Sequence, residues 1–114
     1  MNTPREWKTV AKVHNPERKA FWEGIFGGDT VPVVSFVPEW ANLPGYDEPQ
    51  PVYMLDLKAI TAEQREKLIK ALARRFGIPE EVVAQRLEEH GVPILASDVT
   101  VMSRDQALVM SAIL

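Results

Sequence analysis

The segment TAEQREKLIKALARRFGIPEEVVAQRLEEHG, residues 61–91, predicts two consecutive helices. Thr61 and Gln64 have the spacing of a capping box, in which each residue satisfies a free backbone amide of the first helical turn. Gly77 and Gly91 follow the two apolar patterns at the positions where helices commonly end. We therefore expect a helical hairpin over residues 62–90, with the other elements arranged around it.

The apolar residues of this hairpin recur at helical spacing, which predicts one buried face on each helix. In the first helix they are Leu68, Ile69, Leu72, Ala73 and Phe76, and in the second they are Val82, Val83 and Leu87. Both faces are expected to pack on a sheet.

The sequence before the hairpin predicts two strands separated by an irregular loop. Residues 31–37 are apolar on both faces, and the prolines at their ends favour an edge position or a short pairing. Residues 52–57 predict a second strand with Tyr53, Leu55 and Leu57 directed inward. Residues 38–51 are rich in proline and predict no regular structure.

The ends of the sequence add two helices and a third strand. A helix is expected from Pro16 to about Phe26, with Asn15 as its cap. Residues 92–102 predict a strand with a bend near Ser97 and Asp98, and a capping box at 103–106 predicts a C-terminal helix. The expected fold is α+β and a single domain over 1–114, with about four helices packed on a small, mostly antiparallel three-stranded sheet in the order α-β-β-α-α-β-α.

Composition limits the function classes. The 114 residues are 46% hydrophobic and 25% charged, as in ordinary globular domains. The absence of cysteine excludes disulfides, thiolate metal sites and cysteine nucleophiles. The net charge of −3 argues against a protein that coats nucleic acid by bulk charge. No signal-peptide core or membrane-length apolar run is present, so we expect no membrane association and a cytoplasmic location.

No common catalytic motif occurs, and only His14 and His90 could supply an imidazole. His90 is expected in the last turn of its helix, where the helix dipole stabilises a cation. We therefore expect no metal and no cofactor, and an enzyme is the third hypothesis, behind two kinds of binding protein.

The stretch LARRFGIPEEVV, residues 72–83, resembles the helix-turn-helix motif, with Ala73 four residues before Gly77. The resemblance implies a nucleic-acid-associated regulator that uses the hairpin 62–90, and this is the alternative function. Its possible phosphate contacts are the cations of the first helix, Arg65, Lys67, Lys70, Arg74 and Arg75. The second helix carries Glu80, Glu81, Glu88 and Glu89, which would repel phosphates, so a nucleic-acid partner is not expected.

More broadly, the chain resembles small hypothetical proteins encoded by phages and prophages. The residues that carry this resemblance are the strand at 52–57, Thr61-x-x-Gln64-Arg65 and Arg75-Phe76-Gly77-Ile78. The resemblance implies no activity and no site residues.

The proline-rich loop 38–51 is the candidate partner-binding site. Its apolar and acidic residues are Trp40, Leu43, Tyr46, Asp47 and Glu48. Trp and Tyr bury much area at small entropic cost, which suits a contact surface. The alternative is that Trp40 and Leu43 fold back as a lid over the sheet edge. The main functional hypothesis is a small soluble non-enzymatic interaction module, accessory, inhibitory or regulatory, that binds a protein partner.

The last eight residues, ALVMSAIL at 107–114, have almost no polar face. We expect the helix that they form to be buried, in a homodimer or partner interface or within the monomer. The interface residues would be Leu108, Val109, Ile113 and Leu114.

Overall fold

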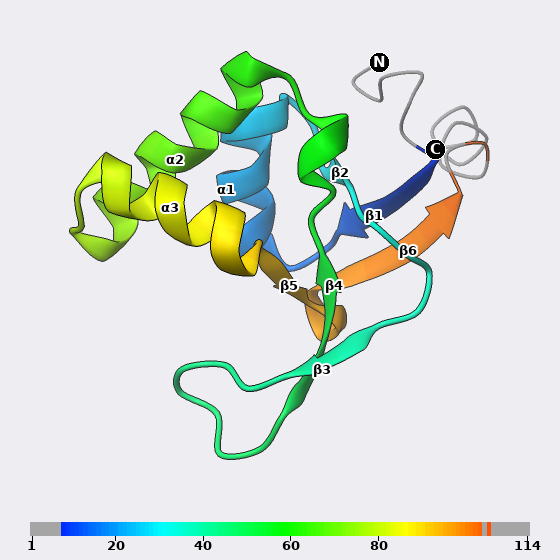
Figure 1. Ribbon diagram of the computed structural model, residues 1–114. Helices are drawn as coiled ribbons and strands as arrows, with labels where there is room; N and C mark the ends of the chain where they lie inside the picture. Colours follow the sequence, from blue (N-terminus) through cyan, green and yellow to red (C-terminus); the bar gives the residue numbers. More distant parts are fainter. Residues whose placement is uncertain (1–7, 104, 106–114) are drawn as a thin grey trace.

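The computed structural model describes residues 8–103 and 105, and it has an α+β fold with two antiparallel sheets of three strands each (Figure 1). The first sheet has the order β2-β1-β6, from β1 (Thr9–Val13), β2 (Thr30–Pro32) and β6 (Val99–Ser103). The second has the order β3-β4-β5, from β3 (Glu39–Ala41), β4 (Gln50–Met54) and β5 (Pro93–Leu95).

The described residues form three α-helices, which lie together on one side of β4 in Figure 1: α1 (Pro16–Phe26), α2 (Ala62–Phe76) and α3 (Glu80–His90). The capping signals explain their ends. Asn15 Oδ1 accepts hydrogen bonds from two amides of the first turn of α1, and Thr61 and Gln64 form the expected capping box on α2. Gly77 ends α2 in the left-handed conformation, at φ 66°, which favours glycine. The predictions for these three helices are confirmed.

The prediction of a single three-stranded sheet is wrong. β1, the central strand of the first sheet, was not expected, because its neighbouring residues Val10 and Ala11 are both buried and leave no alternating pattern. Residues 92–102 form two strands in different sheets, β5 and β6, joined by the 3-10 turn η2 (Ala96–Asp98). The expected bend near Ser97 is therefore the point where the chain changes sheet.

The predicted strand 31–37 is also shorter than expected. β2 is a three-residue edge strand, as its prolines required, and Val33 then forms an isolated bridge with Leu55 that links the two sheets. Val33 lies opposite Leu55, and Glu39 lies opposite Val52. The chain therefore advances six residues along this edge while its partner advances only three. Three extra residues therefore loop outward within residues 34–38, which we name the bulge segment.

The predicted strand 52–57 is likewise only partly formed. β4 ends at Met54, and Leu57 belongs to the 3-10 turn η1 (Leu57–Ala59). The inward residues are Val52 and Leu55, whereas Tyr53 and Leu57 are half-buried at the margin of the core. The prediction that Tyr53 points inward is wrong, because a short strand next to a turn has too few residues to define which side chains alternate inward.

The hydrophobic core lies between the sheets and the helices. It includes Val10 and Val31 of the first sheet and Leu68, Val83 and Leu87 of the hairpin. Phe76 is 64% exposed, so its predicted place on the buried face of α2 is wrong. Phe76 is the last residue of α2, and its side chain lies outside the hydrophobic core. The expected C-terminal helix, which would follow Ser103, lies outside the described residues except at Asp105.

Candidate functional site

The bulge segment and β3 carry an exposed apolar surface. Within seven consecutive residues Val34, Phe36, Val37 and Trp40 are 61%, 54%, 70% and 72% exposed. The bulge is held by a short local bond, in which the Val37 amide donates to Ser35 Oγ at 3.1 Å. Large apolar side chains are therefore presented to solvent by this segment.

The loop between β3 and β4 separates the predicted partner-binding residues into two groups. Leu43 and Tyr46 line a cleft of about 350 Å³, and the Tyr46 amide closes the turn by donating to the Leu43 carbonyl at 3.2 Å. Trp40 does not line this cleft, and Asp47 and Glu48 are exposed beyond it. Leu43 and Tyr46 thus line the cleft, whereas Trp40 is 72% exposed and does not fold back over the sheet edge.

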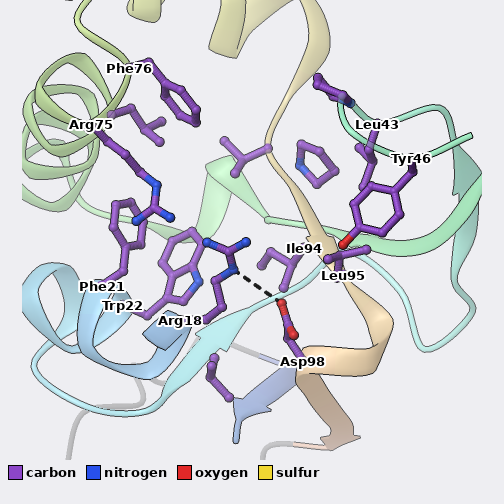
Figure 2. A pocket seen from close by; sticks show the side chains of 15 residues that line it. Arg18, Phe21, Trp22, Leu43, Tyr46, Arg75, Phe76, Ile94, Leu95 and Asp98 are labelled. Atoms are coloured by element: carbon purple, nitrogen blue, oxygen red, sulfur yellow. Dashed lines mark ion pairs between the residues drawn. The ribbon is translucent and has the colours of Figure 1, made fainter. Parts of the chain in front are cut away.

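The cleft lies between this loop, the C-terminal end of α2, the face of α1 and strand β5. Figure 2 shows Phe21, Trp22 and Phe76 on one side and Leu43 and Tyr46 on the other. Trp22 is 5% exposed and contacts the Phe21 ring edge-on, with ring centroids 5.0 Å apart. Trp22 belongs to the hydrophobic core and also lines the cleft.

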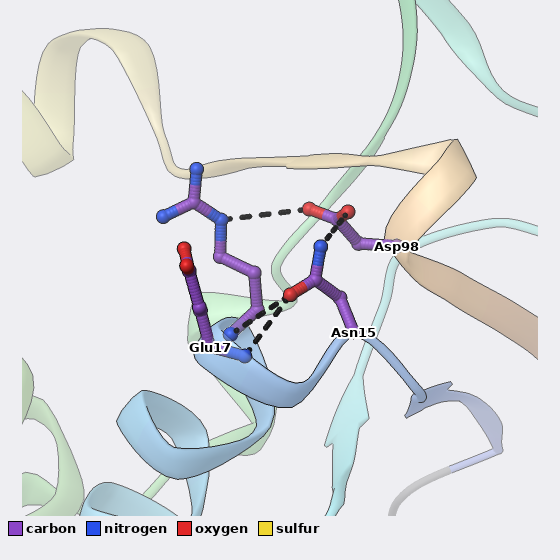
Figure 3. Close-up of polar contacts among 4 residues, drawn as sticks. Asn15, Glu17 and Asp98 are labelled. Carbon is purple, nitrogen blue, oxygen red and sulfur yellow. Dashed lines mark hydrogen bonds and ion pairs between the residues drawn. The ribbon is translucent and has the colours of Figure 1, made fainter.

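Two of the residues that line the cleft, Arg18 and Asp98, belong to a polar group that joins α1 to η2 (Figure 3). Asp98, which is 8% exposed, accepts a hydrogen bond from Asn15 Nδ2 at 2.9 Å and faces Arg18 Nε at 3.5 Å. The Asn15 side chain also caps α1, because its Oδ1 accepts from the Glu17 and Arg18 amides. Asn15 therefore ties the start of α1 to residue 98.

Arg75, at the end of α2, adds a second guanidinium to the cleft. It stands over the Phe21 ring at 5.8 Å from the centroid, which is within the range of a cation–π contact. In the described part of the chain no carboxylate pairs with Arg75. Arg75 was predicted as a possible phosphate contact, and its actual surroundings are aromatic.

The other predicted phosphate contacts lie on the hairpin surface. Arg65 pairs with Glu88 of α3 at 3.0 Å, and the i,i+4 pairs Lys67–Glu63 and Lys70–Glu66 are 3.6 and 3.3 Å long. Arg74 is exposed on the last turn of α2. The basic face of α2 is thus largely interleaved with carboxylates.

Sequence reasoning missed Arg18, Phe21 and Phe76 as cleft residues, and Val34, Phe36 and Val37 as exposed residues. The proline at each end of 32–38 was the available signal for the second group, since two prolines so close leave little room for a paired strand. No local signal pointed to the first group, because the elements that form the cleft are far apart in the sequence. The predicted interface residues Leu108, Val109, Ile113 and Leu114 lie outside the described residues.

The described residues contain no group of three or more His, Asp or Glu side chains that could hold a metal ion. None of their helices has both the length and the apolar character needed to cross a membrane.

Comparisons with protein-family models, with curated proteins and with solved structures found no match to this chain.

Proposed function

We propose that this chain is a small non-enzymatic interaction module that binds a partner protein through the bulge segment and Trp40. The observation that supports the proposal is the exposure of Val34, Phe36, Val37 and Trp40 within seven residues. Single exposed apolar residues are ordinary on protein surfaces, whereas several large ones together are typical of interaction sites. An accessory, inhibitory or regulatory role suits a module of this kind.

The charge of the surrounding segment indicates the chemistry of the partner. Residues 34–51 include the carboxylates of Glu39, Asp47 and Glu48 and contain no lysine or arginine. A complementary partner would present an apolar patch with basic side chains at its rim, since opposite potentials favour correct association. The apolar centre would supply most of the affinity, with Trp40 as the anchoring residue.

Substitution of Trp40 tests the proposal. Trp40→Ala should leave the melting temperature almost unchanged, because the side chain is 72% exposed, and should abolish binding of the partner. The partner is first isolated from an extract of the source cells and identified by mass spectrometry. Its binding to the purified wild-type and Trp40→Ala chains is then measured by calorimetry.

Phe76→Ala is the matched control, because Phe76 is also a large exposed aromatic residue, at 64%, but lies at the end of α2. It should retain partner binding. Equal affinity of the wild-type and Trp40→Ala chains for the captured partner would contradict the proposal.

A further inference from the structure

We infer that the cleft between α1, α2, β5 and the β3–β4 loop binds a small molecule with a planar apolar body and a single carboxylate. This site is separate from the proposed partner surface, because neither Trp40 nor the bulge segment lines the cleft. Its volume of about 350 Å³ lies within the range of small-molecule sites.

The charge balance of the cleft indicates an anionic ligand. Among the described residues that line it, three are charged: Arg18, Arg75 and Asp98. Asp98 is already engaged, with Asn15 on one carboxylate oxygen and Arg18 on the other. Arg75 has no carboxylate partner among the described residues, so one positive charge in the cleft is uncompensated.

The positions of the two guanidinium groups show where the anion would lie. Figure 2 shows Arg18 and Arg75 on the same side of the cleft, with both guanidinium groups directed into it beside Trp22. Arg18 faces Asp98 through Nε, so its terminal nitrogens can donate to a ligand. Arginine binds carboxylates through pairs of parallel hydrogen bonds, and one monocarboxylate would compensate the excess charge.

The walls of the cleft indicate the remainder of the ligand. They are mainly apolar and include aromatic side chains on both sides, with Phe21, Trp22 and Phe76 on one side and Tyr46 on the other (Figure 2). Aromatic rings favour offset or edge contacts with a planar ligand. A planar hydrocarbon body would therefore occupy the space between α2 and the loop while its carboxylate lies between the arginines.

Calorimetric titration of the full chain with 2-naphthoate tests the inference, with 2-naphthylmethanol as the neutral analogue. The naphthoate should bind at least about tenfold more tightly than the alcohol, because charge-assisted hydrogen bonds are worth roughly this factor or more. Arg75→Gln should weaken naphthoate binding by about tenfold and leave binding of the alcohol unchanged.

Arg74→Gln is the matched control. It removes a neighbouring charge from the same last turn of α2, yet Arg74 does not line the cleft, so naphthoate affinity should not change. Circular dichroism of both variants verifies that α2 is retained. Equal affinities for the two ligands, no naphthoate binding, or equal effects of the two substitutions would overturn the inference. None of these outcomes bears on partner binding through Trp40.

Discussion

Asn15 performs two structural tasks that its sequence context reveals only in part. The pattern Asn15-Pro16 identifies a helix cap, and the capping bonds to the Glu17 and Arg18 amides are present. The second task, donation from Nδ2 to Asp98 at 2.9 Å, joins residues 83 positions apart. Because the two tasks use different atoms of one side chain, they can be separated by substitution.

We predict that Asn15→Asp destabilises the fold more than Asn15→Ser. Asn, Asp and Ser are about equally good caps, so both variants retain the capping acceptor. The serine variant only lacks the donor to Asp98 and should lose about 1 kcal/mol of unfolding free energy. The aspartate variant also places a second carboxylate against Asp98 and should lose about 2–3 kcal/mol. Urea denaturation at pH 7 measures both, and an aspartate variant as stable as the wild type would show that the Asp98 contact contributes nothing.

The accuracy of the sequence predictions differs between helices and strands for a physical reason. Helices α1, α2 and α3 are marked by local features: caps, glycines and apolar spacing within a few residues. β1 pairs with β6, whose residues follow some ninety positions later, so no local pattern identifies the pair. The bridge between Val33 and Leu55 also joins residues distant in the sequence, so no local pattern predicts it. This bridge causes the chain to loop outward after Val34.

Deletion of part of the bulge segment tests whether this segment contributes to the stability of the fold. We predict that deletion of residues 35–37 leaves the unfolding free energy within about 1 kcal/mol of the wild type, because short changes in exposed loops cost little. The deletion would place Pro38 next to Val34 and bring the bridge at Val33 into register with β3. The bond from the Val34 amide to the Met54 carbonyl, 3.0 Å long, is retained. Partner binding should be lost with Phe36 and Val37.

A double substitution controls for the altered backbone. Phe36→Ser with Val37→Ser keeps the full length of the bulge and removes its apolar side chains, and it should also abolish partner binding while preserving stability. A loss of several kcal/mol in the deletion variant would mean that the bulge contributes to the fold rather than to a contact surface.

The sequence predicted some residues of the candidate sites but not the cleft. Trp40 and Tyr46 stood out because aromatic residues in a proline-rich loop are conspicuous. The cleft did not, since Arg18, Arg75 and Asp98 come from three elements that meet only in the folded chain. Arg75 illustrates the difference, because its helix suggested a phosphate contact and the structure places it over Phe21.

The distribution of charge over the hairpin leads to a final prediction, that the chain does not read DNA sequence. Three of the five cations on α2 face carboxylates at 3.0 to 3.6 Å, so a phosphate backbone would have to displace these pairs. On α3, the helix that would enter the groove in a helix-turn-helix protein, Glu80, Glu81 and Glu89 are exposed. Any weak complex with duplex DNA would depend on Arg74 and Arg75, which have no carboxylate partner among the described residues.

Mobility-shift assays at two salt concentrations provide the measurement. Binding detected at low salt should fall steeply toward physiological salt, since it arises from counterion release, and the double variant Arg74→Ala, Arg75→Ala should remove it. The double variant Lys67→Ala, Lys70→Ala is the comparison, because both lysines are already paired within α2 and should contribute less. Tight binding at physiological salt that distinguishes one DNA sequence from another would contradict the prediction, because an acidic α3 would then have to contact base edges despite its charge.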